Sequence, residues 1–206
     1  MKNPLTSICL IMILASACAQ TPSTERKVGT RCEDCEMMFE GMPQSISWET
    51  RLTDSNEPGE PMVISGTIYK PDGKTPAPEI ILYIYHTDAQ GNYSPSKNQK
   101  NARRHGHIRG WMKTGENGRY QFTSIRPASY PNRQAPQHIH PIIKEHGTSI
   151  YWIDEFLFDD DPLLTEKEKS SQEKRGGSGI IHLTKNKEGV WIGKRDIILG
   201  INVPDY

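Results

Sequence analysis

The sequence lacks an excess of charge of either sign, a long amphipathic helix and a second pair of closely spaced cysteines. Its 206 residues contain 25 basic and 25 acidic side chains. This balance argues against the basic surface that nucleic-acid-binding proteins carry, so we expect no nucleic-acid partner. The 15 prolines and 17 glycines favour frequent turns and short strands over a helical bundle.

Cysteine usage narrows the possibilities further. Of the four cysteines, Cys32 and Cys35 form a C-x-x-C pair, while Cys9 and Cys18 lie near the N-terminus. A C-x-x-C pair is half a zinc site, but no second pair supplies the other two ligands. A redox dithiol normally opens a helix after a strand, and the flanking sequence does not have that pattern. We therefore expect a local disulfide, as oxidising compartments allow.

The first 18 residues have the pattern of an export signal. Lys2 precedes a mostly apolar stretch, residues 5–14, and the cleavage region A-S-A-C ends at Cys18. Small residues directly before a cysteine are typical of bacterial lipoprotein signals, in which Cys18 would carry the lipid anchor. Ala15 stands where leucine is usual, which leaves an ordinary secretory signal as the alternative. The apolar stretch is too short for a confident membrane span. Both interpretations place the mature protein outside the cytoplasm, and the first attaches it to a membrane of the bacterial cell envelope.

We divide the remaining chain into a tether with a C-x-x-C arm, residues 19–44, and one domain, residues 45–206. Polar residues 19–29 are typical of a flexible tether. Beyond them, short apolar or alternating stretches are separated by turn residues, which predicts an all-β, antiparallel β-sandwich. The expected strands cover residues 45–51, 62–69, 80–86, 108–113, 119–125, 139–144, 151–158, 179–183, 190–192 and 197–201. The charged residues 165–177 are expected to form a loop insertion or a short helix.

The segment most indicative of chemistry is Y-P-N-R-Q-A-P-Q-H-I-H, residues 130–140. In an extended strand, His138 and His140 would project from the same side, because side chains two residues apart share a face. Two imidazoles on one face provide half of a metal coordination sphere. Tyr130, at the head of the segment, is a third candidate ligand. Two ordinary surface histidines remain the alternative for this motif taken alone.

A longer series of motifs resembles a known family. The motifs are G-T-I-Y-K-P-D-G-K-T-P-A-P (66–78), D-A-Q-G-N-Y (88–93), R-G-W-M-K-T-G-E-N-G-R-Y-Q-F-T-S-I-R-P-A-S-Y-P (109–131), H-I-H (138–140) and Y-W-I-D-E-F-L-F-D-D-D-P-L (151–163). Their order resembles the intradiol ring-cleavage dioxygenases, non-haem iron(III) enzymes that open catechols between the two hydroxyl-bearing carbons. The resemblance covers residues 62–165, about half of the chain, and implies the β-sandwich of that family.

The resemblance implies an iron(III) site made of two tyrosines and two histidines. The family's ligand positions fall on Tyr93, Tyr130, His138 and His140, and all four carry the expected residue type. By the same resemblance, Tyr130 and His140 would be axial, whereas Tyr93 and His138 would be equatorial with a hydroxide. The implied substrates are a small catechol-type aromatic and O2. Tyr130 would leave the iron when the catechol binds and take up one of its protons.

The sequence departs from the family pattern at two points. Where the family usually has an arginine three residues before its first ligand histidine, this chain has Ala135, and the nearest guanidinium belongs to Arg133. Only seven residues separate Tyr130 from His138, so the pocket wall is shortened. We take Tyr130 and Arg133 as the candidate catalytic residues. A relative that binds metal without turnover is one alternative, and it is consistent with Ala135.

A second alternative is a surface binding module of the transthyretin-like or carboxypeptidase-regulatory kind. Such domains share the G-x-I-Y-x-P-D-G start and the N-G-R-Y-x-F hairpin, but have no need for the four metal ligands.

Other aromatic and charged residues are predicted to be structural. The strand aromatics should pack in the core or on sheet faces: Tyr83, Tyr85, Trp111 and Tyr120. Two charged clusters should lie in solvated loops or turns and bind no metal. They are Arg103, Arg104, His105 and His107, and Asp159, Asp160 and Asp161. Arg126 and Arg133 flank the site, and each is equally suited to an anionic substrate or to a structural role.

Overall fold

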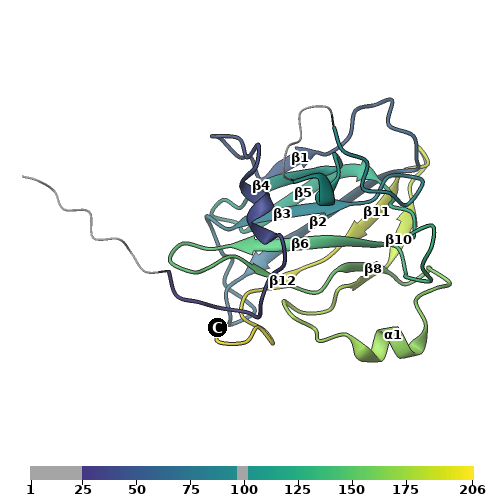
Figure 1. Cartoon of the computed structure of the whole chain (residues 1–206). Coiled ribbons are helices and arrows are strands. Elements are labelled where there is room, and N and C mark those ends of the chain that lie inside the picture. Colours follow the sequence, from purple (N-terminus) through teal and green to yellow (C-terminus); the bar gives the residue numbers. More distant parts are fainter. Residues whose placement is uncertain (1–24, 97–101) are drawn as a thin grey trace, which may run out of the picture.

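Two β-sheets packed face to face make up the body of the protein (Figure 1). The computed structural model describes residues 25–96 and 102–206. The predicted export signal, the lipid attachment at Cys18 and most of the tether therefore lie outside the described residues. Within the described ranges, no helix is long and apolar enough to cross a bilayer.

The first sheet has the strand order β1-β5-β2-β11-β10. Its strands are β1 (Glu49–Arg51), β5 (Arg119–Ile125), β2 (Pro61–Tyr69), β11 (Trp191–Lys194) and β10 (Leu183–Lys185), with β12 (Ile197–Ile198) also paired to β2. The long β2 and β5 are antiparallel. In contrast, β1 joins β5 in parallel, and β11 and β12 both run parallel to β2.

The second sheet has the order β4-β3-β6-β8-β9 and positions the candidate site. Its strands are β4 (Arg109–Lys113), β3 (Ile81–His86), β6 (His138–Lys144), β8 (Phe156–Phe158) and β9 (Ile180–Ile181), with β7 (Tyr151–Trp152) also paired to β6. The expected β-sandwich is thus confirmed, and the pairs formed by the long central strands are antiparallel, while further strands join in parallel and make both sheets mixed. The chain crosses between the sheets at His182, and the later strands β11 and β12 then run alongside β2 in the same direction.

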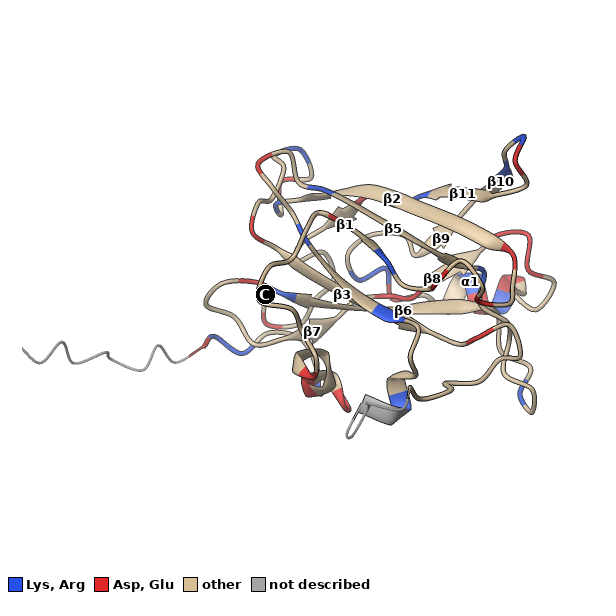
Figure 2. Cartoon of the chain, turned by 90° about the horizontal axis from the view of Figure 1, so that it is seen from above, with Lys and Arg blue, Asp and Glu red and all other residues tan. Residues whose placement is uncertain are grey.

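The main core lies between the sheets, which Figure 2 shows edge-on. Alternation along β2 buries Met62, Ile64 and Ile68 completely and leaves the intervening residues partly exposed. From the two facing layers, Phe122 and Phe156 meet edge to face with ring centroids 6.0 Å apart. Each sheet therefore packs one face against the core, and its outer face remains available for other contacts.

The outer face of the second sheet is partly covered by the C-x-x-C arm. The 3-10 helix η1 (Cys35–Phe39), purple in Figure 1, lies across this face, and the expected disulfide joins Cys32 to Cys35. Met38 is fully buried there in a second apolar cluster. The indole of Trp111 donates a hydrogen bond to the Met38 carbonyl at 2.7 Å.

Two details of the chain trace differ from the sequence-based expectations. Val28, expected in the tether, is 3% exposed and belongs to the main core. The expected strand over residues 151–158 is divided into β7 and β8, because Asp154 in between accepts hydrogen bonds from the N–H groups of Lys174 and Arg175. The charged segment 165–177 does contain a short helix, α1 (Glu166–Ser171), capped by the Thr165 side chain.

We expect the stability of the fold to fall as the pH is lowered from about 6.5 to about 4. His86 is fully buried, with its ring nitrogens 2.8 Å from the Thr87 carbonyl and the Ser124 hydroxyl. Burial lowers the pKa of His86 to about 4, whereas the unfolded chain takes up this proton near pH 6.5. Because the unfolded state binds more protons in this window, the free energy of unfolding should decrease by up to about 1.4 kcal/mol per pH unit.

The measurement is urea unfolding at several pH values. His86→Gln should make the profile less steep by about one proton, and the control His146→Gln, which changes an exposed histidine, should leave it unchanged. Equal slopes in the wild type and His86→Gln would contradict this prediction.

Candidate metal centre

The candidate site lies on the outer face of the second sheet, where β6 begins. Ile139 points into the core and is fully buried, so alternation turns His138 and His140 outward. His140 is the register partner of Tyr85 on β3, and their rings stack with centroids 4.7 Å apart. The expected geometry of the H-I-H motif on one strand face is therefore present.

The four predicted ligands come together at this point. The phenol oxygens of Tyr93 and Tyr130 lie 2.8 Å apart, and the Tyr130 oxygen lies 2.9 Å from Nε2 of His138. The ring centroids of His138 and His140 are 4.6 Å apart, and those of Tyr93 and His140 are 6.3 Å apart. Two strand residues and two loop residues, spread over 48 positions from 93 to 140, thus form one cluster of oxygen and nitrogen donors.

A glycine allows the two tyrosine loops to approach each other. Asp88 holds the first loop by accepting hydrogen bonds from the N–H groups of Gln90 and Asn92. Gly91, in the same loop, has φ +78°, and a Cβ there would lie 2.1 Å from the carbonyl oxygen of Ser129 in the second loop. Only glycine combines this backbone conformation with this contact.

A backbone acceptor orients the ring of His138. Its Nδ1 lies 2.7 Å from the Pro136 carbonyl oxygen, which requires the proton on Nδ1 and leaves the Nε2 lone pair toward the cluster. A carbonyl partner of this kind is typical of metal-binding histidines, because it fixes the tautomer and the ring direction. Nδ1 of His140 lies 3.6 Å from a carboxylate oxygen of Glu155, which is too far for a hydrogen bond.

Burial keeps the isolated cluster neutral. It raises the pKa of Tyr93 far above that of a free phenol, and the hydrogen bond to Tyr130 adds to the effect. Burial also raises the pKa of Tyr130. For His140, burial and the neighbouring His138 lower the pKa well below its ordinary value. Phenolates would therefore form near neutral pH only with a strong positive charge at the centre of the cluster.

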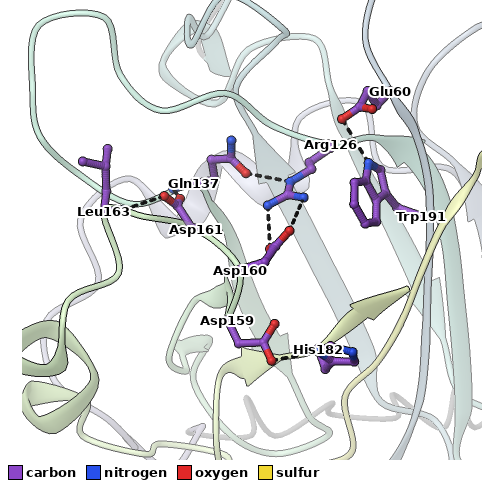
Figure 3. Close-up of polar contacts among 9 residues, drawn as sticks. All are labelled: Glu60, Arg126, Gln137, Asp159, Asp160, Asp161, Leu163, His182 and Trp191. Atoms are coloured by element: carbon purple, nitrogen blue, oxygen red, sulfur yellow. Dashed lines mark hydrogen bonds and ion pairs between the residues drawn. The ribbon is translucent and has the colours of Figure 1, made fainter. Parts of the chain in front are cut away.

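A polar network next to the site fixes the start of β6 (Figure 3). Arg126 forms a two-pronged ion pair with Asp160, at 2.8 and 2.9 Å, and also donates to the side chain of Gln137 at 2.7 Å. The N–H of Gln137 in turn donates to Asp161 at 2.6 Å. Since Gln137 directly precedes His138, the network sets the position of that ligand. Arg126 is thus structural.

The expected solvated turn is present at Asp159 and Asp160, which are exposed, but not at Asp161. Asp161 is only 6% exposed, Asp160 pairs with Arg126, and Asp159 pairs with His182 at 2.8 Å. Each aspartate therefore has a specific partner that connects it to β5, β6 or the β9–β10 crossover.

A cavity of about 770 Å³ opens beside the cluster. Tyr93, Tyr130, His140 and Arg133 line it, and the Arg133 guanidinium carbon lies 5.9 Å from the centre of the Tyr130 ring. Glu33 and Asp34 of the C-x-x-C arm also line the cavity. The candidate catalytic residues Tyr130 and Arg133 thus border the same space.

This cavity is also lined by two residues for which the sequence predicted a packing role or a solvated loop. Tyr85 lines it, and His105 lines it while being only 2% exposed. Their rings stack at 3.8 Å, and Nδ1 of His105 lies 2.9 Å from the Tyr83 hydroxyl. Burial lowers the pKa of His105 to about 4, so it is neutral near pH 7. Strand alternation in I-L-Y-I-Y-H places Tyr83 and Tyr85 on one face, but only the pairing of β3 with β6 shows that this face carries the site.

Within the described ranges, no group of three or more His, Cys, Asp or Glu side chains is arranged to hold a metal ion. His107 has other partners, the Ser94 carbonyl and the Glu57 carboxylate. The candidate centre has only two histidines, so tyrosine oxygens must supply its other protein donors. Metal–ligand bonds of about 2 Å at right angles place two donor atoms about 2.8 Å apart. The observed separations of 2.8 and 2.9 Å fit this requirement.

Comparison with known proteins identifies the family. The family model described as dioxygenase matches residues 39–173, which is more than half of the chain and includes all four candidate ligands. The chain belongs to the intradiol ring-cleavage dioxygenase family.

The curated relatives are catechol 1,2-dioxygenases. Catechol 1,2-dioxygenase of Acinetobacter baylyi is 32% identical over 129 residues, which cover 52% of this chain and 39% of the relative. Catechol 1,2-dioxygenase 1 of Acinetobacter lwoffii is 33% identical over 97 residues, covering 45% of this chain and 30% of the relative. The chain therefore matches less than half the length of these members of the dioxygenase family.

Solved structures show the same fold. The dioxygenase domain of a dioxygenase–carbohydrate-binding protein fusion from Streptomyces sp. SirexAA-E superposes with a TM-score of 0.56 at 20% identity, covering 78% of this chain and 92% of that domain. Wild-type catechol 1,2-dioxygenase of Acinetobacter radioresistens gives a TM-score of 0.58 at 18% identity, covering 77% and 58%. The β-sandwich of this chain is thus the fold of the family.

Replacing Gly91 with alanine should separate the two tyrosine loops. The new Cβ would adopt an unfavourable positive φ and collide with the Ser129 carbonyl, at an expected cost of about 1–3 kcal/mol of unfolding free energy. Gly115→Ala is the matched control, since a Cβ at Gly115 has no atom within 4 Å, and its effect should stay within about 0.5 kcal/mol. Denaturant unfolding measures both, and equal stabilities of the two variants would refute the steric argument.

Proposed function

We propose that the protein is a non-haem iron(III) dioxygenase that cleaves a catechol-type ring between its two hydroxyl-bearing carbons. The observation that carries the proposal is the convergence of Tyr93, Tyr130, His138 and His140, with donor atoms 2.8 and 2.9 Å apart. Membership of the dioxygenase family supports the same reaction. Phenolate oxygens suit a hard, highly charged cation such as Fe(III), and two imidazoles complete four protein ligands.

Each ligand has a distinct task in this proposal. A bound ferric ion would act as a Lewis acid that makes the coordinated catechol reactive toward O2. Tyr93 and the two histidines would hold the metal, and the Pro136 carbonyl keeps the His138 imidazole oriented. The Tyr130 oxygen, which lies at the cavity, accepts a proton from a catechol hydroxyl. Both atoms of O2 enter the ring-opened dicarboxylic acid, so no external reductant is required.

Arg133 is the proposed source of positive charge near the substrate. Ala135 has no charge to offer, whereas the Arg133 guanidinium lies on the cavity rim next to Tyr130. A cation at this place favours the anionic form of a bound catechol. The alternative of a metal-binding relative without turnover depends on whether Arg133 serves this purpose.

Iron quantitation together with a visible spectrum tests the proposal. The purified protein should contain one iron per chain and absorb visible light through charge transfer from phenolate to iron(III), and addition of catechol should shift the band. Absence of iron and of colour after reconstitution would refute the enzyme and favour a surface binding module. Iron with a catechol-dependent shift but no O2 consumption would identify the relative without turnover.

Tyr93→Phe should remove the visible band or shift it strongly, because it deletes one of the two phenolate donors. Tyr69→Phe is the control, since Tyr69 lies at the end of β2 in the other sheet. The colour and the iron content of each variant are measured at equal protein concentration. A Tyr93→Phe protein with the wild-type spectrum would exclude Tyr93 from the ligand set.

We also propose that the protein is exported and anchored to a membrane of the cell envelope through a lipid on Cys18. The disulfide between Cys32 and Cys35 supports an oxidising compartment. Cells grown with a labelled fatty acid should yield a labelled protein in the membrane fraction, and Cys18→Ala should abolish the label. Label retained in Cys18→Ala would contradict anchoring at this residue.

A further inference from the structure

Part of the cavity wall comes from a segment outside the family match. We define the arm as residues 31–38; it precedes the region 39–173 that the dioxygenase family model covers. Glu33 and Asp34 of the arm nevertheless line the cavity next to Tyr85 and His140. A smaller cavity of about 110 Å³ between the arm and β6 is lined by both arm cysteines and again by His140. The arm therefore borders the site directly.

The arm is held in place by contacts that do not involve Glu33 or Asp34. The disulfide closes its turn, and Met38 is fully buried against the outer face of the second sheet. The Met38 carbonyl accepts a hydrogen bond from Trp111 at 2.7 Å, and the Met37 carbonyl accepts one from Arg109 at 3.3 Å. The two acidic side chains thus project from a fixed support.

Two carboxylates and one guanidinium of the described residues line the cavity at the arm. Arg104 pairs with Asp34 at 2.5 Å and lies 3.6 Å from Glu33. Among the described residues that line this part of the cavity, one guanidinium therefore faces two carboxylates. Arg133 stands on the rim beside Tyr130, so the cavity has an acidic edge at the arm and a basic residue at the Tyr130 loop.

The cavity is also larger than a single ring requires. At about 770 Å³ it is in the range of pockets that hold ligands of drug size, about 300–1,000 Å³. A catechol placed at the four-donor cluster leaves room for a ring substituent. Such a substituent can extend to the acidic edge formed by Glu33 and Asp34.

We infer that Glu33 and Asp34 determine substrate specificity by favouring catechols whose ring substituent carries an ammonium group over those whose substituent carries a carboxylate. This inference rests on the proposed function, because it assumes that the catechol ring binds at the four-donor cluster. Coulombic attraction at the partly hydrated rim supplies the preference. In this proposal the two carboxylates neither coordinate the metal nor take part in the proton transfer to Tyr130. Their effect is therefore on substrate binding.

The test compares two catechols of similar length and opposite charge. Dopamine carries an ammonium group on a two-carbon chain, and 3-(3,4-dihydroxyphenyl)propionate carries a carboxylate on a chain of the same length. Their dissociation constants are measured by calorimetry on the full-length, iron-loaded protein without oxygen, so that no turnover occurs. The variants are Glu33→Gln/Asp34→Asn, Glu33→Gln alone, and the control Glu36→Gln, an exposed arm acid that does not line the cavity.

The wild type should bind dopamine more tightly than the propionate. In Glu33→Gln/Asp34→Asn the preference should fall by about threefold to tenfold, with a smaller fall in Glu33→Gln and none in Glu36→Gln. Asparagine tolerates the φ of +60° at Asp34, so the fold and the iron content should be preserved, and the visible band confirms this.

The outcomes separate the inference from the proposed function. An unchanged ratio in the double variant, or equal loss of affinity for both ligands, would overturn the inference while leaving the metal site intact. If the iron-loaded wild type binds neither plain catechol nor the two derivatives, the proposed function fails, and the inference fails with it.

Discussion

The pairing of β3 with β6 is the constraint on which the site depends. Its register places His140 opposite Tyr85 and Ile139 opposite His86, so that one face of β6 is apolar and core-facing while the other carries both histidines. A shift by one residue would turn the histidines into the core and the isoleucines outward. The hydrophobic requirement of the core therefore fixes the metal ligands, because burial of Ile139 and Ile143 holds the strand in this register.

The loop ligands are placed by weaker but more specific means. Tyr93 and Tyr130 lie in segments without regular structure, and their oxygens meet only because Gly91 lets one loop lie against the Ser129 carbonyl of the other. In the resulting cluster, burial favours neutral phenols and neutral imidazole. A bound trivalent cation would oppose that preference, since its charge stabilises phenolate. In the proposed function, the protein therefore supplies a preformed donor set whose protonation state would depend on the metal.

Local patterns in the sequence predicted most strands and brought the four candidate ligands to one place, but they did not predict their surroundings. Alternation predicted the strand with His138 and His140, and the order of motifs assigned the two tyrosines to the same site. The parallel pairs, such as β1 with β5 and β8 with β9, could not be predicted in this way, because they depend on contacts distant in sequence. For the same reason Tyr85 and His105 were expected to pack or be solvated. Their place at the cavity follows from sheet register and from a loop that returns over the sheet.

The arm illustrates how a short chain completes such a site. The chain matches less than half the length of its curated relatives, and its cavity is lined both by the segment that begins at Tyr130 and by the arm. The arm has only eight residues, and so small an element cannot form a core of its own. It is instead held by a local disulfide, by one buried methionine and by carbonyls that accept hydrogen bonds from Trp111 and Arg109. Because these anchors do not include the two acidic side chains, whose partner is Arg104, the charge at the arm can be varied while the disulfide, Met38 and the two carbonyl contacts remain.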